Sequence, residues 1–222
     1  MSRVLLCDDH SIFAEALAMA LAARGQDVVA VTRTVPEGVA RTVSEQPDVV
    51  LMDLHFADGP DGFSGMRAMA GLPHPPKVVL LSGAVGRRTL ADAVAAGADG
   101  VVSKTEPLEV LLDAVERVAA GAFHVDPELL RGSLRPAPAD LDHVQLSAQF
   151  LTPREREVLG RLVQGASTRE LAQAMGVGVA TIRTHVQSVL SKLGVRSRLE
   201  AVSVAVAHGL YDPPQRRVPV QS

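Results

Sequence analysis

Cysteine is almost absent from this sequence. Its 222 residues include a single cysteine, Cys7, so no disulfide can form within the chain. Disulfides persist mainly in oxidising compartments, and their absence here favours a reducing cytoplasm. Cys7 lies within the first apolar run, and we expect it to be a small buried hydrophobic residue.

Long apolar runs are also absent. No stretch approaches the roughly 18 consecutive apolar residues of a membrane-spanning helix, so we expect no membrane span. The first ten residues, MSRVLLCDDH, hold a short apolar run that ends in two aspartates, a pattern unlike that of a signal peptide. The sequence therefore predicts neither secretion nor a membrane as a partner.

The charged residues are unevenly distributed along the chain. Residues 1–150 contain 12 Lys and Arg and 20 Asp and Glu, a net charge of −8, whereas residues 151–222 contain 10 and 5, a net charge of +5. An acidic first part and a basic last part indicate two modules with different partners. The basic part is the candidate for binding nucleic acid.

Residues 1–121 show a regular alternation of short apolar runs and helical stretches. The runs are rich in Val and Leu with little alternation, as in strands buried on both faces of a sheet. Strands are expected at 3–8, 27–31, 48–53, 77–82 and 99–104, and helices at 11–24, 36–46, 62–71, 86–96 and 107–120. Five such units predict a doubly wound α/β domain with helices on both faces of a parallel sheet.

Residues 122–148 lack this alternation and are predicted to be a linker, with a short helix near 126–131. Regular structure resumes in residues 149–212, where helices are expected at 153–164, 168–175, 179–193 and 198–208. Three of them begin with the capping-box pattern of a Ser or Thr N-cap and a Glu three residues later. The pairs are Thr152 and Glu155, Ser167 and Glu170, and Ser197 and Glu200. This second module is therefore predicted to be a small all-α domain.

Polar side chains follow four of the predicted strands at their carboxyl ends. Asp8 and Asp9 follow the first strand, Asp53 ends the third, Ser82 the fourth, and Lys104 the fifth. Ligands of open parallel sheets bind beyond these ends, so the five side chains should converge. Three carboxylates held together repel one another, and Mg²⁺, which prefers oxygen ligands, would relieve that repulsion. The set suits phosphoryl transfer to Asp53 as nucleophile, with the cation and Lys104 neutralising charge and Ser82 donating to a phosphoryl oxygen.

In residue type and position, these five strand-end residues resemble the receiver domain of two-component response regulators. The resemblance implies that Asp53 accepts phosphate from a sensor histidine kinase. It also implies that Mg²⁺ is held by Asp9, Asp53 and the backbone carbonyl of His55, with Asp8 helping through water. The side chain of His55 is expected to be solvated, as a lone histidine in a loop usually is.

The helix expected at 179–193 is amphipathic. Its apolar positions, which should face inward, are Ile182, Val186, Val189, Leu190 and Leu193. Arg183, Thr184 and Gln187 fall together on the opposite side, with Lys192 a turn beyond. Arginine pairs with guanine and glutamine with adenine, so this face can read a major groove. An isolated helix of this kind could equally have a solvated polar face, but the short turn that joins it to the helix at 168–175 favours a helix-turn-helix.

The segments LTPREREVL, STRELA, TIRTHVQSVLSKLGV and SRLEAV, in this order, resemble the LuxR/FixJ-type helix-turn-helix domain of NarL-like proteins. The residues that the resemblance assigns to DNA are Arg183, Thr184 and Gln187 in the groove and His185 and Lys192 near backbone phosphates. It also implies a homodimer on promoter DNA when the protein is active, with Val202 and Val206 at the dimer contact. RNA polymerase is a further partner that it allows.

Two features depart from the receiver pattern. Val101 stands three residues before Lys104, where receivers commonly carry a Tyr or Phe ring that turns inward on phosphorylation. The loop DLHFADGPDG after Asp53 lacks the usual proline and is one residue longer. We therefore expect intact phosphorylation chemistry with an altered relay to the outer face.

In the helical module Gly178 replaces the usual N-cap, which weakens the cap by roughly a few tenths of a kcal/mol.

We expect a DNA-binding response regulator and not an enzyme, and three alternatives remain to be tested. One keeps DNA binding but makes it independent of phosphorylation, as Val101 and the altered loop suggest. An aspartyl-phosphate phosphohydrolase usually has a second acid two residues after its nucleophile, where this chain has His55. The third is a protein-binding scaffold, against which the charge distribution and the face formed by Arg183, Thr184 and Gln187 both argue.

Overall fold

The computed structural model describes residues 1–126, 130 and 149–211. The first part of the chain forms one sheet of five parallel strands in the order β2-β1-β3-β4-β5. The strands are β1 Arg3–Cys7, β2 Asp27–Thr32, β3 Val49–Asp53, β4 Lys77–Ser82 and β5 Gly100–Ser103. Because the strand order reverses between β1 and β3, their carboxyl ends border the crevice where open α/β sheets bind ligands.

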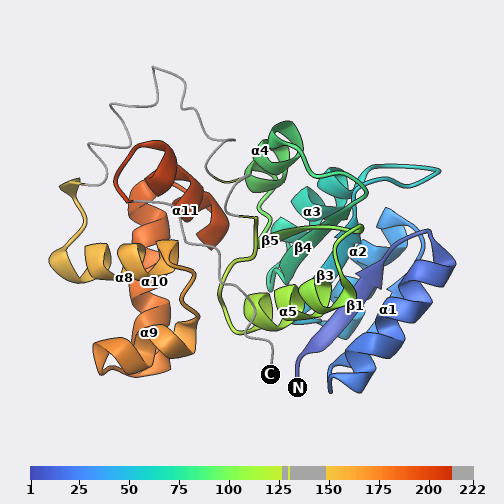
Figure 1. The fold of residues 1–222 in the computed structure, drawn as a ribbon, viewed down its shortest axis with the longest axis horizontal. Helices are drawn as coiled ribbons and strands as arrows, with labels where there is room; N and C mark the ends of the chain where they lie inside the picture. The colour runs from blue at the N-terminus through green and yellow to red at the C-terminus, as the bar shows by residue number, and fades with distance from the viewer. Residues whose placement is uncertain (127–129, 131–148, 212–222) are drawn as a thin grey trace.

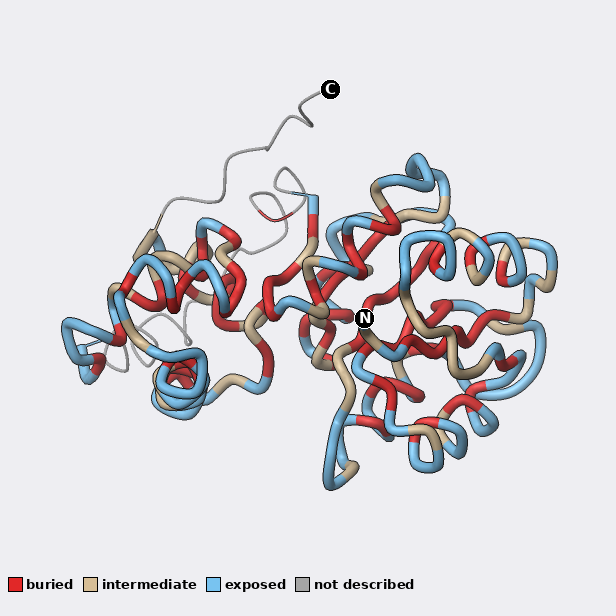
Figure 2. The backbone as a smooth tube through the Cα atoms, turned by 90° about the horizontal axis from the view of Figure 1, so that it is seen from below, coloured by how far each residue is buried: buried red, intermediate tan, exposed pale blue. Residues whose placement is uncertain are grey.

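Five helices cover the two faces of this sheet (Figure 1). They are α1 Ser11–Ala23, α2 Val35–Glu45, α3 Gly62–Ala70, α4 Arg87–Ala95 and α5 Leu108–Ala119. Successive strand residues point to opposite faces, so each strand serves two cores. Leu5 and Leu80 pack on the side of α2, α3 and α4, whereas Leu6 and Leu81 pack on the side of α1 and α5. Figure 2 shows this burial concentrated in the strands and the inner faces of the helices.

The strands and helices end within one residue of the bounds predicted from the sequence. The apolar runs are buried along their length, as β3 illustrates, because helices cover both faces. The short helix predicted near 126–131 falls largely outside the described residues. Phe123 and Val125, at the start of the predicted linker, are buried, and the His124 carbonyl accepts the Val101 N–H at 2.8 Å. The packed part of the sheet domain thus continues to Val125.

The second part of the chain contains the helices α8 Pro153–Val163, α9 Thr168–Met175, α10 Val179–Leu193 and α11 Arg198–Ala207. Both hydrogen bonds of the capping box form at α8 and at α9. At α11 only half of the predicted box forms, because the Glu200 carboxylate accepts the Arg196 N–H at 2.7 Å instead of the Ser197 N–H. The helix α10 forms over its predicted range although Gly178 provides no side-chain cap. Within residues 1–126 and 149–211, no helix is long and apolar enough to cross a membrane.

The helical module contacts the sheet domain along a surface that we call the seam, at the amino ends of β4 and β5 (Figure 1). The helix α11 packs beside α4. The Ser197 hydroxyl donates to the Ala98 carbonyl at 3.1 Å, just after α4. The Arg198 guanidinium donates to the Gly121 carbonyl and, at 2.9 Å, to the Thr168 hydroxyl. The seam therefore lies at the end of the sheet opposite Asp53.

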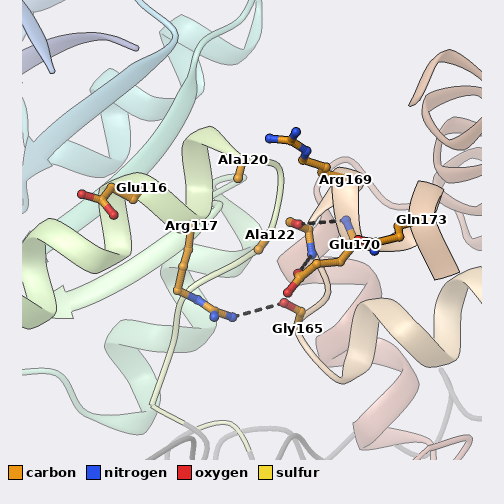
Figure 3. A pocket seen from close by; sticks show the side chains of 9 residues that line it. Glu116, Arg117, Ala120, Ala122, Gly165, Arg169, Glu170 and Gln173 are labelled. Atoms are coloured by element: carbon orange, nitrogen blue, oxygen red, sulfur yellow. Dashed lines mark hydrogen bonds between the residues drawn. The ribbon is translucent and has the colours of Figure 1, made fainter. Parts of the chain in front are cut away.

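A second set of contacts joins the end of α5 to the start of α9. The Thr168 N–H donates to the Ala120 carbonyl at 3.2 Å, and the Arg117 guanidinium donates to the Gly165 carbonyl at 3.2 Å (Figure 3). A pocket opens beside these bonds, and its lining includes Arg169. Most of these bonds end on backbone carbonyls, so no sequence pattern indicates them.

Candidate functional site

The carboxylates predicted to converge at the strand ends do converge. Cys7 of β1 lies opposite Met52 of β3 in parallel register, so Asp8 and Asp53 follow as neighbours. Asp8 and Asp53 are buried, with 1% and 3% of their surfaces exposed, and Asp9 lies closer to solvent. Ligand atoms of these three residues and of His10 all lie within 4.8 Å of one another. We call this cluster the acidic pocket.

Lys104 supplies positive charge to the acidic pocket. Its Nζ lies 2.7 Å from Asp8 Oδ2 and 2.7 Å from Asp53 Oδ2, and 5.0 Å from the centre of the Phe13 ring, a cation–π contact. Burial raises the pKa of Asp53, and Asp8 raises it further, while the bond to Lys104 acts in the opposite direction. One ammonium group faces three carboxylates, so the pocket keeps an excess of negative charge.

The carboxylate oxygens of the acidic pocket suit a hard divalent cation. Asp8 Oδ2, Asp9 Oδ1 and Asp53 Oδ2 are buried and accept no aligned hydrogen bond from the described residues, so the contacts of Lys104 are ion pairs. The other oxygen of Asp9, Oδ2, accepts the Ala57 N–H at 2.7 Å, which holds this carboxylate in place. Convergent carboxylates with free lone pairs are the ligands that such cations take.

His55 contributes its backbone to the acidic pocket. Its backbone N–H lowers the pKa of the Asp53 carboxylate, while its side chain is exposed, as the sequence predicts. Ligation of a cation by its carbonyl stays a prediction. The loop that carries His55 returns close to Asp53 at Gly62, whose N–H donates to the Leu54 carbonyl at 3.0 Å. A Cβ at Gly62 would lie 2.1 Å from the Asp53 carbonyl oxygen, so only glycine fits beside this strand end.

Ser82 lies at the pocket, but its hydroxyl points into its own turn. It is buried, and its Oγ donates to the Ala84 carbonyl at 2.9 Å. Its carbonyl accepts the Lys104 N–H at 2.8 Å, which ties the end of β4 to the end of β5. The hydroxyl would have to leave Ala84 before it could donate to a group on Asp53. If the Ser82 side chain rotates towards a group on Asp53, the loop that leads into α4 would therefore move with it.

Val101 occupies the position where receivers commonly carry an aromatic ring. Its side chain is buried among the residues that α4 covers, and it lies opposite Leu80 of β4. A valine has no ring that could alternate between a buried and an exposed position. That a signal from Asp53 passes through another element stays a prediction.

The helix α10 presents the two faces that its sequence predicts. Its apolar side chains are buried in the module: Ile182, Val186, Val189, Leu190 and Leu193. Arg183, Thr184 and Gln187 are exposed, and His185 is half-buried. The Thr184 hydroxyl donates to the Ala180 carbonyl at 3.2 Å, so it is partly engaged within its own helix. An exposed Arg and Gln one turn apart can reach base edges in a major groove.

Comparisons with known families agree with this geometry. Residues 4–116 match the response regulator receiver domain, and residues 149–205 match the bacterial regulatory proteins of the luxR family. The chain is a response regulator of the luxR family. It is therefore a DNA-binding transcription factor and not an enzyme.

Two curated relatives match this response regulator along nearly its whole length, and a solved structure matches over part of it. The response regulator protein VraR of Staphylococcus aureus is 30% identical over 212 residues, which is 94% of this chain and 98% of VraR. The transcriptional regulatory protein LnrK of Bacillus subtilis is 28% identical over 95% of this chain and 99% of its own. A two-component response regulator of the LuxR family from Aurantimonas superposes with a TM-score of 0.56 and 28% identity over 60% of this chain and 95% of its own.

Lys192 of this response regulator has a partner that the sequence did not indicate. Its Nζ lies 2.7 Å from Glu155 Oε2 and donates to the Phe150 carbonyl at 3.3 Å. Glu155 is 5% exposed; burial raises its pKa, but bonds from Lys192 and Thr152 outweigh burial and hold the pKa below its usual value. The predicted role of Lys192 at DNA phosphates therefore competes with a contact that holds α10 to the start of α8.

The predicted dimer contact also needs a correction. Val202 has no exposed surface and packs in the core of the helical module, so it cannot touch a partner in this conformation. Val206, one turn further, is half-buried and keeps an outer surface. Helical spacing places both residues on one side of α11, but it does not show how much of that side the module itself covers.

Sequence reasoning also missed residues at both ends of the receiver. His10 and Phe13 contact the acidic pocket, and Arg198 anchors the seam. His10 could have been suspected, because it directly follows the two aspartates. Nothing in the sequence marks Phe13 or Arg198, because their partners lie far away along the chain.

Proposed function

We propose that Asp53 accepts a phosphoryl group from a sensor histidine kinase and that this modification controls binding to promoter DNA. The observation that carries the proposal is the acidic pocket, where Asp53 lies buried between Lys104 and two further carboxylates. An Asp53 oxygen would form the new bond to phosphorus while the bond to the histidine nitrogen of the kinase breaks. A Mg²⁺ ion held by Asp9, Asp53 and the His55 carbonyl, with Asp8 helping through water, would neutralise charge on the phosphoryl oxygens.

The residues of the pocket divide the remaining work. Lys104 already lies 2.7 Å from Asp53 Oδ2, so its ammonium can contact the phosphoryl oxygens once they are bound to Asp53. The Ser82 hydroxyl can exchange the Ala84 carbonyl for a phosphoryl oxygen, which moves the loop at residues 83–86. That loop leads directly into α4, and α4 packs beside α11. The helix α4 thus spans from the acidic pocket to the seam and replaces the missing ring as the route of the signal.

The contacts at the seam favour a DNA-binding surface that the receiver partly covers before phosphorylation. Arg183 is exposed, yet it lies near enough to Lys77 and Arg198 to act on them electrostatically. Burial, and then repulsion from Arg198 and Arg183, lowers the pKa of Lys77 at the start of β4. The edge of α10 at Arg183 therefore lies within electrostatic range of Lys77 at the start of β4, and a DNA duplex that reaches Arg183 would approach the receiver there. We infer that phosphorylation loosens the seam and frees this edge.

The coupling between phosphorylation and DNA binding should be weak. With Val101 in place of a ring, we expect phosphorylation to raise operator affinity about tenfold, or roughly 1.4 kcal/mol, near the low end of allosteric coupling. The measurement compares the unmodified chain, the phosphorylated chain and the fragment from Leu151 onward on one operator. Arg198→Ala, which removes the bonds to Gly121 and Thr168, should bring the unmodified chain towards the affinity of the fragment. An increase of several hundredfold would show strong coupling without the ring and contradict this account.

We expect Arg183 and Gln187 to read bases. Arg183→Ala should reduce affinity by about 1–3 kcal/mol and relax the preference at one base position, because one bidentate contact is lost. The measurement is binding to a set of single-base variants of an operator selected from random DNA. Thr181→Ala, at an exposed position of the same helix, provides the matched control. An equal loss of affinity on every variant would mean that Arg183 contacts phosphates only.

A homodimer is the proposed active form. A structure with 18% identity and a TM-score of 0.54 contains RcsB dimers bound to DNA, and it shares the fold of this chain. The half-buried Val206 and the half-buried Ala207 on α11 remain the proposed contact, and the packing of α11 beside α4 would limit access to it before phosphorylation. The free thiol of Cys7 suits a reducing cytoplasm, and there the protein would meet both the kinase and the promoter.

One alternative keeps the DNA binding but removes phosphate as its trigger. The buried Val101 favours it, since the usual coupling ring is absent. The same comparison of unmodified and phosphorylated protein decides between the two, because the alternative predicts equal operator affinities.

A further inference from the structure

His10 directs a ring nitrogen into the acidic pocket. Its Nδ1 lies 3.0 Å from Asp9 Oδ1, 3.3 Å from Asp8 Oδ1 and 3.6 Å from Asp53 Oδ2. Its backbone N–H donates to Asp8 Oδ1 at 2.9 Å, which fixes this residue at the start of α1 over the pocket. One imidazole nitrogen thus faces carboxylates from the ends of both β1 and β3.

These separations match those between ligands of one metal ion. With bonds of about 2.1 Å, neighbouring ligands of an octahedral ion lie about 3 Å apart. Asp9 Oδ1, which is nearest to the ring, is buried and accepts no hydrogen bond from the described residues. On Asp8 the ring approaches Oδ1 while Lys104 approaches Oδ2, so the contacts of His10 and Lys104 use different oxygens.

We propose, building on the proposed function, that His10 is a further ligand of the divalent cation and sets which cations the pocket prefers. Imidazole nitrogen suits Co²⁺, Ni²⁺ and Zn²⁺, whereas Mg²⁺ prefers oxygen ligands. The His10 side chain is 68% exposed, so Nε2 can hold its proton towards solvent and leave the lone pair of Nδ1 towards the carboxylates. The pocket of this chain therefore favours borderline transition ions more than an all-oxygen pocket does.

The test measures Ni²⁺ and Mg²⁺ binding to the full chain by calorimetry, with His10→Gln as the variant. The exposed His74, between α3 and β4 at the opposite end of the sheet, gives His74→Gln as the matched control. Loss of one imidazole ligand should weaken Ni²⁺ binding about tenfold or more and leave Mg²⁺ binding within about threefold, because only the transition ion gains from nitrogen. The visible absorption of bound Co²⁺ should change in His10→Gln and not in His74→Gln.

Two outcomes would overturn the proposal. Equal weakening of Ni²⁺ and Mg²⁺ would mean that His10 only orients the carboxylates, and unchanged binding of both would mean that the ring is no ligand. A His10→Ala variant guards against an effect of the introduced amide, and it should behave as His10→Gln does. The mass of the wild-type protein after incubation with acetyl phosphate and Mg²⁺ tests the proposed function separately from this proposal. If the wild type takes up a phosphoryl group but His10→Gln leaves the metal preference unchanged, only the proposal that His10 is a ligand is wrong. If the wild type takes up no phosphoryl group but His10→Gln changes the metal preference, only the proposed phosphorylation is wrong.

Discussion

The Asp53→Asn variant is expected to take up no phosphoryl group from acetyl phosphate, whereas the wild type takes up one. An amide cannot replace the carboxylate as nucleophile, and Asp53 lies buried beside Lys104 at the end of β3 in the acidic pocket. Chelation of divalent cations should abolish uptake by the wild type as well, because the remaining carboxylates would repel the phosphoryl donor. Intact-protein mass spectrometry measures both effects directly.

The matched control for this variant is Asp58→Asn. Asp58 is exposed in the same loop, so its amide removes the same charge without touching the pocket. It should take up one phosphoryl group as the wild type does. Uptake by Asp53→Asn at the normal level, or uptake that survives chelation, would contradict the assignment of Asp53 and of the cation.

Lys192→Ala should destabilise the helical module by about 2–3 kcal/mol. Removing one partner of a buried ion pair costs about 3–5 kcal/mol, and the partial exposure of Lys192 reduces this value. Glu155 would keep its two cap bonds with Thr152 but lose the charge that balances it. The variant should therefore unfold at lower urea concentration before it shows any defect that is specific to DNA.

Tyr211 offers a probe confined to this module. It is the one tyrosine of a chain without tryptophan, its hydroxyl donates to the Arg156 carbonyl at 2.8 Å, and its ring lies against Gly160. Its fluorescence during urea unfolding reports on the module in the full chain. Arg196→Ala removes an exposed charge as a control, and Glu155→Gln in the Lys192→Ala background should recover part of the loss. If Lys192→Ala leaves the stability unchanged and weakens binding to all DNA sequences equally, Lys192 contacts DNA phosphates as the sequence predicts.

Strand and helix positions could be predicted because the patterns that specify them are local. The runs around Val49–Asp53 show burial on both faces, and the parallel topology brings the carboxyl ends of the strands together. The convergence of Asp8, Asp53 and Lys104 follows from these two facts alone. The same reasoning placed Arg183 and Gln187 on the outer face of α10.

Contacts across long sequence separations could not be predicted in this way. Lys192 and Glu155 are 37 residues apart, and Arg198 and Gly121 are 77 apart. A helical period shows that Val202 faces one side of α11, but only the tertiary packing around α11 shows that it is fully buried. Ser197 and Glu200 match a capping box in sequence, yet the competing Arg196 N–H takes the Glu200 carboxylate.

Operator affinity with and without a phosphodonor decides whether phosphate on Asp53 controls DNA binding. The measurement uses the full-length wild type and Asp53→Asn, each in Mg²⁺ on the selected operator, with the phosphorylated fraction determined by mass. We expect the operator affinity of the wild type to rise about tenfold and that of Asp53→Asn to stay the same. A rise in both proteins, or no rise in fully phosphorylated wild type, would contradict it.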